Sequence, residues 1–267
     1  MAADLLKRIP MQLSGKSIVV TGASGIAAAG AMRAAAEGAR VFIISLLEEE
    51  CLALAGRVAD VGAEVGWVKA DLTDESEADR AFAAAATHLE RLDGLLAVAG
   101  GSGRAHGDGP AHEIPLDGWA RTMAMNTHPF FLATRNAIGQ MGDGGGSIVI
   151  VSSVLASSPA PSLFATHAYA SAKGAANAFV TAAAAYYAGQ GIRVNAIAPG
   201  LVRTPMSERA GSDPVTMEFA ARKQPLAGGF VEPEEIASLA SFLLSDDATM
   251  ITGQVIAVDG GWSVTGA

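Results

Sequence analysis

Short apolar runs of strand length alternate with helix-forming stretches along all 267 residues of the chain. The run at 17–20 is rich in β-branched residues and ends in Thr21-Gly22. From there a glycine turn leads into a helix of small residues, and a second apolar run follows at 41–44. Parallel strands need a crossover of this kind, usually a helix. The pattern repeats about seven times without a linker-like break, so the sequence predicts a single α/β domain, 1–267, with helices flanking a doubly wound parallel sheet.

The remaining strands and the main helices follow from the same pattern. Further strands are predicted at 65–70, 94–101, 147–153, 192–198 and 255–258. Helices are predicted at 75–91, 116–141 and 168–188, and one with proline in its first turn opens near residue 233. The stretch 201–230 is irregular, with a short helix expected near 215–222. We interpret this stretch as a substrate lid, because long irregular loops in compact domains are usually functional.

Composition excludes several classes of function. Half of the residues are hydrophobic, yet no run approaches the ~20 apolar residues that cross a bilayer. Residues 1–11 lack the apolar centre of a secretory signal, so we expect a cytoplasmic protein with no membrane partner. A net charge of −9 argues against a nucleic-acid partner. Cys51 is the only cysteine and the five histidines show no ligand spacing, so no metal site is predicted; His167 is the histidine best placed to line a pocket.

A tyrosine and a lysine stand four residues apart in the helix predicted at 168–188. Tyr169 and Lys173 would therefore lie on one helix face. An ammonium beside a phenol favours the phenolate and lowers the pKa of the phenol, which could then exchange a proton with an alcohol or ketone near neutral pH. Such pairs also arise by chance on amphipathic helices. Ser153 at a strand end and Asn126 on the preceding helix would face the same cleft, which strengthens the catalytic interpretation.

The glycine turn after the first strand, Gly22 to Ala27, is a candidate phosphate site. Backbone N–H groups and a helix N-terminus face outward at such a junction. The turn is not a regular Gly-x-Gly-x-x-Gly, and a tight turn of this kind occurs in many α/β proteins without any ligand.

In this order and at these spacings, the motifs resemble the short-chain dehydrogenase/reductase family over nearly the whole chain. The matching segments are Thr21 to Ile26, Asp71-Leu72, Ala99-Gly100, Asn126, Ser152-Ser153, Tyr169 with Lys173, Asn195 to Gly200 with Thr204, and Val258 to Gly261. The resemblance implies a Rossmann-type domain and an NAD(P)-dependent oxidoreductase that interconverts a secondary alcohol and a ketone. Within the family, the chain is most similar to 3-oxoacyl-acyl-carrier-protein reductases and related alcohol dehydrogenases.

The family resemblance also implies residue roles. Tyr169 would be the general acid/base, and Lys173 would lower its pKa and hydrogen-bond the nicotinamide ribose. Ser153 would polarise the substrate oxygen, and Asn126 would hold a water in a proton relay, although Asn126 could instead merely bond the backbone. The implied residues of the cofactor site are Gly22, Ser24, Gly25, Ile26, Ser45, Asp71, Leu72, Ala99, Gly100, Tyr169, Lys173, Pro199, Gly200, Val202 and Thr204.

The chain departs from the family pattern at three places. The glycine turn is one residue short and ends in Ala27, so the pyrophosphate cradle must differ in detail. Residues 97–100 read Ala-Val-Ala-Gly and lack the side-chain amides that brace the sheet in the family. Ser45 stands where an acid would bind the ribose of NAD or a base the phosphate of NADP. Glu48 could supply the acid and no Lys or Arg lies nearby, so a slight preference for NAD(H) over NADP(H) is expected.

Two further expectations concern partners and an alternative function. The protein is predicted to be a homo-oligomer, a tetramer built on the Ala-rich helix that carries Tyr169. The alternative is a non-catalytic nucleotide-binding or redox-sensing protein on the same fold. The presence of Asn126, Ser153, Tyr169 and Lys173 together argues against it, because a sensor has no need of a proton relay.

Overall fold

The computed structural model describes residues 11–266; the first ten residues and the last residue of the predicted domain lie outside this range. Residues 11–266 form one parallel sheet of seven strands in the order β3-β2-β1-β4-β5-β6-β7. The predicted doubly wound α/β fold is thereby confirmed. The strands are β1 (Ser17–Thr21), β2 (Arg40–Ser45), β3 (Val65–Lys69), β4 (Gly94–Ala97), β5 (Gly146–Val151), β6 (Ile192–Pro199) and β7 (Val255–Val258).

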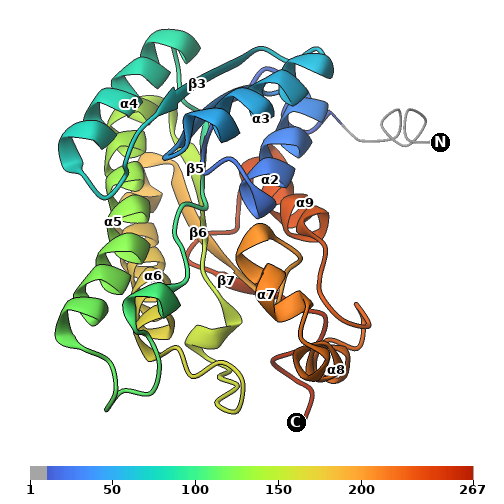
Figure 1. The fold of residues 1–267 in the computed structure, drawn as a ribbon. Coiled ribbons are helices and arrows are strands. Elements are labelled where there is room, and N and C mark those ends of the chain that lie inside the picture. The colour runs from blue at the N-terminus through green and yellow to red at the C-terminus, as the bar shows by residue number, and fades with distance from the viewer. Residues whose placement is uncertain (1–10, 267) are drawn as a thin grey trace.

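Helices cover both faces of this sheet, as Figure 1 shows. One layer consists of α2, α3 and α9, and the other of α4, α5 and α6. Right-handed crossovers place successive helices on one face until the chain reverses direction across the sheet. The helices are α2 (Gly25–Ala36), α3 (Glu48–Asp60), α4 (Glu75–Leu89), α5 (Leu116–Met141), α6 (His167–Tyr187), α7 (Glu208–Gly211), α8 (Pro214–Lys223) and α9 (Pro233–Leu244).

The central strands are buried on both faces, which explains their continuous apolar sequences. All five residues of β1 and all four of β4 are buried. A strand with helices on both sides has no solvated face and needs no polar alternation. No helix in the described part of the chain is long and apolar enough to span a bilayer.

The strand order changes direction between β1 and β4, and this opens a crevice at the carboxyl ends of the strands. The strands predicted at 94–101 and 147–153 end earlier, at Ala97 and Val151, so the residues after them leave the sheet and line the crevice. The Thr21 hydroxyl accepts the N–H groups of Val98 and Ala99 at 3.0 and 3.1 Å. A hydroxyl of β1 thus braces this segment without the amides that the sequence lacks.

The two ends of the predicted lid, residues 201–230, lie next to each other. Val202 forms a parallel bridge with Val231, and the Val231 N–H donates to the Leu201 carbonyl at 2.9 Å. Between these pinned ends lie α7 and α8, the latter within a residue of the expected helix at each end. The segment predicted as a lid is therefore a helical excursion whose two ends are hydrogen-bonded to each other.

Candidate active site

One cavity of about 750 Å³ occupies the crevice at the carboxyl ends of the strands. Every residue predicted for catalysis or cofactor binding lines it. They are Gly22, Ser24, Gly25, Ile26, Ser45, Asp71, Leu72, Ala99, Gly100, Asn126, Ser153, Tyr169, Lys173, Pro199, Gly200, Val202 and Thr204. The fold thus brings together residues separated by up to 182 positions, from Gly22 to Thr204 (204 − 22), although their individual roles stay predictions.

Helix α6 presents Tyr169 and Lys173 on one face, as their spacing predicted. The Lys173 Nζ lies 5.6 Å from the centre of the Tyr169 ring, and Ser153 is close enough to the Tyr169 phenol to lower its pKa. The Ser153 Oγ also accepts the N–H of Leu155 at 3.2 Å, which fixes the serine at the end of β5. A phenol, a hydroxyl and an ammonium therefore converge on the wall of the cavity.

Two hydrogen bonds fasten Lys173 to the end of β5. Its Nζ donates to the Val151 carbonyl at 2.9 Å, and the Ser152 hydroxyl donates to the Lys173 carbonyl at 3.1 Å. Only 6% of the Lys173 surface is exposed. Side chain and main chain of one residue thus hold the helix against the strand that carries Ser153.

Burial is the main cause of the pKa shifts of Tyr169 and Lys173. Desolvation raises the pKa of Tyr169 above its ordinary value, and the hydrogen bond from Ser153 only partly offsets the rise. Desolvation also lowers the pKa of Lys173 from 10.5 to about 8. The predicted lowering of the Tyr169 pKa is therefore wrong for this structure. The free energy lost when the phenolate is removed from water exceeds the stabilisation that Ser153 provides.

The side chain of Asn126 forms three hydrogen bonds with backbone groups. Its Oδ1 accepts the Gly101 N–H at 3.1 Å, and its Nδ2 donates to the carbonyls of Gly101 and Thr122, each at 3.0 Å. This is the backbone-bonding alternative that the sequence left open. In the same helix Pro129 has no N–H, so the Met125 carbonyl lacks its usual helical donor.

The shortened glycine turn still delivers a helix N-terminus to the cavity. Helix α2 begins at Gly25, and its N-cap Ser24 makes no side-chain capping bond, so first-turn N–H groups remain available to an anion. A Cβ on Gly25 would come within 2.8 Å of the Thr204 Cγ2. The turn is thus packed directly against the base of the lid. These free donors and the bare backbone fit the pyrophosphate of a dinucleotide.

Comparison with known proteins identifies the family. A family model described as enoyl-(acyl carrier protein) reductase matches residues 20–263. The cis-4-hydroxycyclohexanecarboxylate dehydrogenase of Sinomonas cyclohexanicum is 38% identical over 247 residues, covering 92% of this chain and 95% of that protein. A short-chain type dehydrogenase/reductase from Mycobacterium ulcerans superposes with a TM-score of 0.88 at 32% identity, over 94% of this chain and 91% of that one. The chain belongs to the short-chain dehydrogenase/reductase family.

A further relative adds to this assignment. The 2,5-dichloro-2,5-cyclohexadiene-1,4-diol dehydrogenase of Sphingobium indicum is 34% identical over 255 residues, covering 95% of this chain and 98% of that protein. The resemblance inferred from the motifs is confirmed, and with it the class of the protein as an oxidoreductase.

The end of the cavity near β2 and β3 carries acids and no base. Ser45, Leu46 and Leu47 line it after β2, as do Glu50 on α3 and Asp71 after β3. The acid of α3 that reaches the cavity is thus Glu50, and the sequence-based choice of Glu48 is corrected. Glu48 opens the first turn of α3, and Glu50 lies two residues further along.

Sequence reasoning missed Asp108, which anchors the N-terminus of α6. The Asp108 Oδ1 accepts the N–H of Ala168 at 2.9 Å, and its Oδ2 accepts the N–H of Tyr169 at 3.0 Å. The helix has no side-chain cap of its own, because the N-cap Thr166 makes none. Asp108 is 7% exposed, and its charge suits the helix dipole. A loop 60 residues upstream therefore fixes where the helix of Tyr169 begins.

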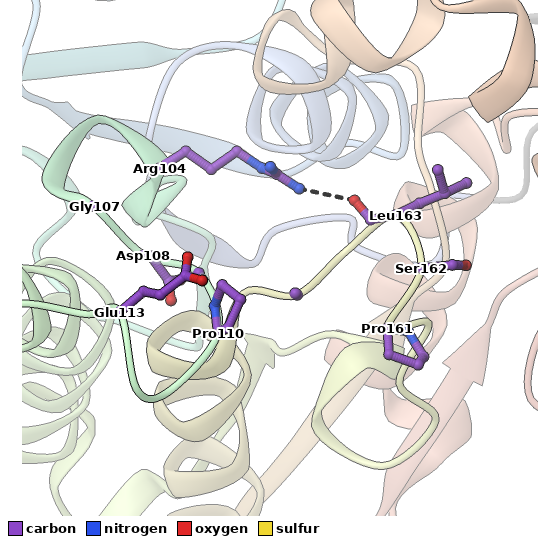
Figure 2. A pocket seen from close by; sticks show the side chains of 10 residues that line it. Arg104, Gly107, Asp108, Pro110, Glu113, Pro161, Ser162 and Leu163 are labelled. Atoms are coloured by element: carbon purple, nitrogen blue, oxygen red, sulfur yellow. Dashed lines mark hydrogen bonds between the residues drawn. The ribbon is translucent and has the colours of Figure 1, made fainter.

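The same loop is tied to α6 and to the segment before it by further bonds. His167 Nδ1 accepts the Ala111 N–H at 3.0 Å, and His167 is not among the residues that line the cavity, contrary to its expected place. Arg104 Nη2 donates to the Leu163 carbonyl at 3.0 Å (Figure 2). Arg104 and Leu163 also line a second cavity of about 340 Å³ between the two segments.

Removing the Asp108 carboxylate should loosen the catalytic helix. In Asp108→Ala two backbone donors lose their acceptor, so we expect the protein to lose about 1–3 kcal/mol of unfolding free energy. Turnover should fall on the order of tenfold or more, because Tyr169 loses its anchor. Chemical denaturation and steady-state kinetics measure both. Asp117→Ala is the matched control, since Asp117 is an exposed carboxylate in the first turn of α5. Equal, small effects of both variants would contradict the anchoring role.

The depressed pKa of Lys173 makes stability depend on pH. Between its folded pKa of about 8 and its unfolded value of 10.5, the unfolded chain binds more protons, so the unfolding free energy rises with pH. From pH 8 to 9.5 the wild type should gain roughly 1.5 kcal/mol relative to Lys173→Met. Denaturation curves across this range measure the difference. Lys69→Met, at an exposed end of β3, should follow the wild type. A constant difference between wild type and Lys173→Met would contradict the burial effect.

Proposed function

We propose that the protein interconverts a secondary alcohol and a ketone, with Tyr169 as the general acid/base. The carrying observation is that Ser153, Tyr169 and Lys173 all line the wall of the cavity into which the N-terminus of α2 opens. A bound nicotinamide dinucleotide supplies the capacity to accept or donate a hydride. The chain then has to orient the substrate oxygen and to move one proton.

The side chains divide this work. Tyr169 donates its proton to the ketone oxygen or takes one from the alcohol, and its raised pKa keeps it a proton donor at neutral pH. The Ser153 Oγ is already an acceptor for Leu155, so its own O–H is free to donate to the phenol or the substrate oxygen. Lys173 uses one N–H on Val151 and retains others for the ribose and for passing protons toward the Asn126 turn.

The first turn of α2 would hold the pyrophosphate, and Ser45, Glu50 and Asp71 would face the adenosine ribose. A ribose 2′-hydroxyl can donate to carboxylates, whereas a 2′-phosphate beside them would be repelled. We therefore propose NAD(H) as the preferred cofactor over NADP(H).

The substrate is proposed to be a small alcohol of mixed polarity. Two relatives are named for alcohols on six-membered carbon rings, and a third, 37% identical, is a galactitol 2-dehydrogenase of Cereibacter sphaeroides. The proposed substrate end of this cavity carries Leu155, Phe164 and Trp262, and the flat aromatic faces of the last two suit a carbon ring. Residues 201–230 would close over it as a lid.

We further propose a cytoplasmic homotetramer. On the helical layer of α5 and α6, Phe131 is 46% exposed and Tyr186 is 73% exposed. Near the sheet edge at β7, Val255, Met250 and Val264 are also exposed. Two separate apolar faces are what an assembly with perpendicular two-fold axes would need. The location and the assembly remain predictions.

Replacing the phenol hydroxyl tests the reaction. Tyr169→Phe should lower kcat by at least about a hundredfold, because the proton has no other donor at that position, while NADH should bind as in the wild type. Alcohol-dependent reduction of NAD and a nucleotide titration measure the two properties. Tyr186→Phe on the exposed face of the same helix is the matched control. Undiminished turnover in Tyr169→Phe would overturn the assignment and favour a non-catalytic nucleotide-binding protein.

A further inference from the structure

Acidic and basic residues line different parts of the large cavity. The acids that line it, Glu50 and Asp71, follow β2 and β3 at the proposed adenosine end. The other charged residues that line it are all cations: Lys173, buried beside Tyr169, and two arginines, Arg104 and Arg209. The two arginines thus line the large cavity in a chain of net charge −9, although Asp108 and Glu113 line the second cavity that Arg104 also borders.

Arg104 comes from the loop after β4 and is held in place. One of its five N–H donors goes to the Leu163 carbonyl (Figure 2), and the guanidinium has no second hydrogen-bond partner within residues 11–266. The carboxylate that stabilises its charge is that of Asp108, but both oxygens of that group already accept backbone N–H groups of α6. No carboxylate of residues 11–266 lies within 4.0 Å of Arg104.

Arg209 lies on α7, in the segment predicted as a lid, and also lines the large cavity. The other two arginines of the lid segment are paired: Arg203 with Glu232 at 2.8 Å, and Arg222 with Glu218 at 3.0 Å. Arg209 has no such partner among the described residues. The Asp213 carboxylate already accepts hydrogen bonds from the N–H and the hydroxyl of Thr216, which lower its pKa, and the charge of Arg209 lowers that pKa further.

The two guanidinium groups are close enough to repel each other. Partial burial lowers the pKa of Arg104, and the charge of Arg209 lowers it further. Holding two like charges at the mouth of a cavity costs free energy unless an anion lies between them. Arginine pairs match the planar geometry of a carboxylate, which can accept from both.

We propose that the substrate is an alcohol or ketone that also bears a carboxylate, and that Arg104 and Arg209 bind this carboxylate across the mouth of the cavity. The inference rests on the proposed function, since it places the reacting carbon at Tyr169 and the apolar body of the molecule against Phe164 and Trp262. Because Arg209 lies on the lid and Arg104 on the fixed loop, the carboxylate draws the lid toward the loop. The substrate then contributes to its own enclosure.

The competing assignment is that Arg209 serves the cofactor pyrophosphate. The lid base contacts the glycine turn through Thr204, so α7 is not far from that site. Arg104, in contrast, extends from the loop that is clamped to the N-terminus of α6, and it lines the second cavity as well. The test must therefore measure carboxylate and cofactor binding separately.

The test compares acids with their uncharged amides. Calorimetry on the NADH-loaded protein would measure the affinity of cyclohexanecarboxylate against cyclohexanecarboxamide, and of hexanoate against hexanamide. The wild type should bind each acid at least about tenfold more tightly than its amide, since bonds between charged groups are the stronger ones. Arg104→Met and Arg209→Met should each bring the ratio close to one and leave NADH affinity unchanged. Arg222→Met removes a paired lid arginine and should preserve the wild-type ratio.

Each other result contradicts the proposal. Equal binding of acid and amide by the wild type, or absence of binding by both, would overturn it. If Arg209→Met weakens NADH at least about tenfold and leaves the acid-to-amide ratio intact, the arginine serves the pyrophosphate. Failure of the proposed function is seen separately, as loss of NADH binding or of alcohol turnover in the wild type. A rise in ionic strength should also reduce the acid preference, because the pair is partly exposed.

Discussion

The attachment of Lys173 to the end of β5 is the contact on which the rest of the site depends. A buried lysine donates to Val151 while its own carbonyl accepts from Ser152. Breaking either bond would leave a buried polar group unpaired, a cost that holds helix and strand in one relative position. That position sets Tyr169 beside Ser153. The depressed pKa of Lys173 is the energetic consequence of placing an ammonium there, and a ligand with hydroxyl or phosphate oxygens would repay part of it.

A second layer of contacts determines how this pair faces the cavity. Asp108 fixes the first turn of α6, and Asn126 holds Gly101 at the start of the same loop. The loop between them therefore ends on two buried polar anchors, and the arginine it carries is preorganised rather than free. On the other side of the cavity, Thr204 packs against Gly25, so the lid base and the phosphate turn share one contact.

Local sequence pattern was sufficient for the fold and for the common location of Asn126, Ser153, Tyr169 and Lys173 on one cavity, while their catalytic roles stay predictions. Strands β1 and β4 are unbroken apolar runs, and the four-residue spacing of Tyr169 and Lys173 fixes their common face whatever surrounds them. Properties that arise from distant contacts were not predictable. Asp108 caps a helix 60 residues away, and nothing in its own glycine-rich segment indicates a buried carboxylate. The raised pKa of Tyr169 reflects burial, which a motif does not report. The same holds for Glu50, whose place at the cavity depends on how α3 packs on the sheet.

The most direct measurement is a titration of the purified protein with NADH and then with NADPH, followed by nucleotide fluorescence. The free donors at the start of α2 and the acids near Ser45 predict saturable binding of both, with NADH the tighter ligand. Binding of neither nucleotide would show that the shortened turn and Ala27 have closed the phosphate site. The oxidoreductase mechanism built on Tyr169 would then be contradicted, however well its side chains are arranged.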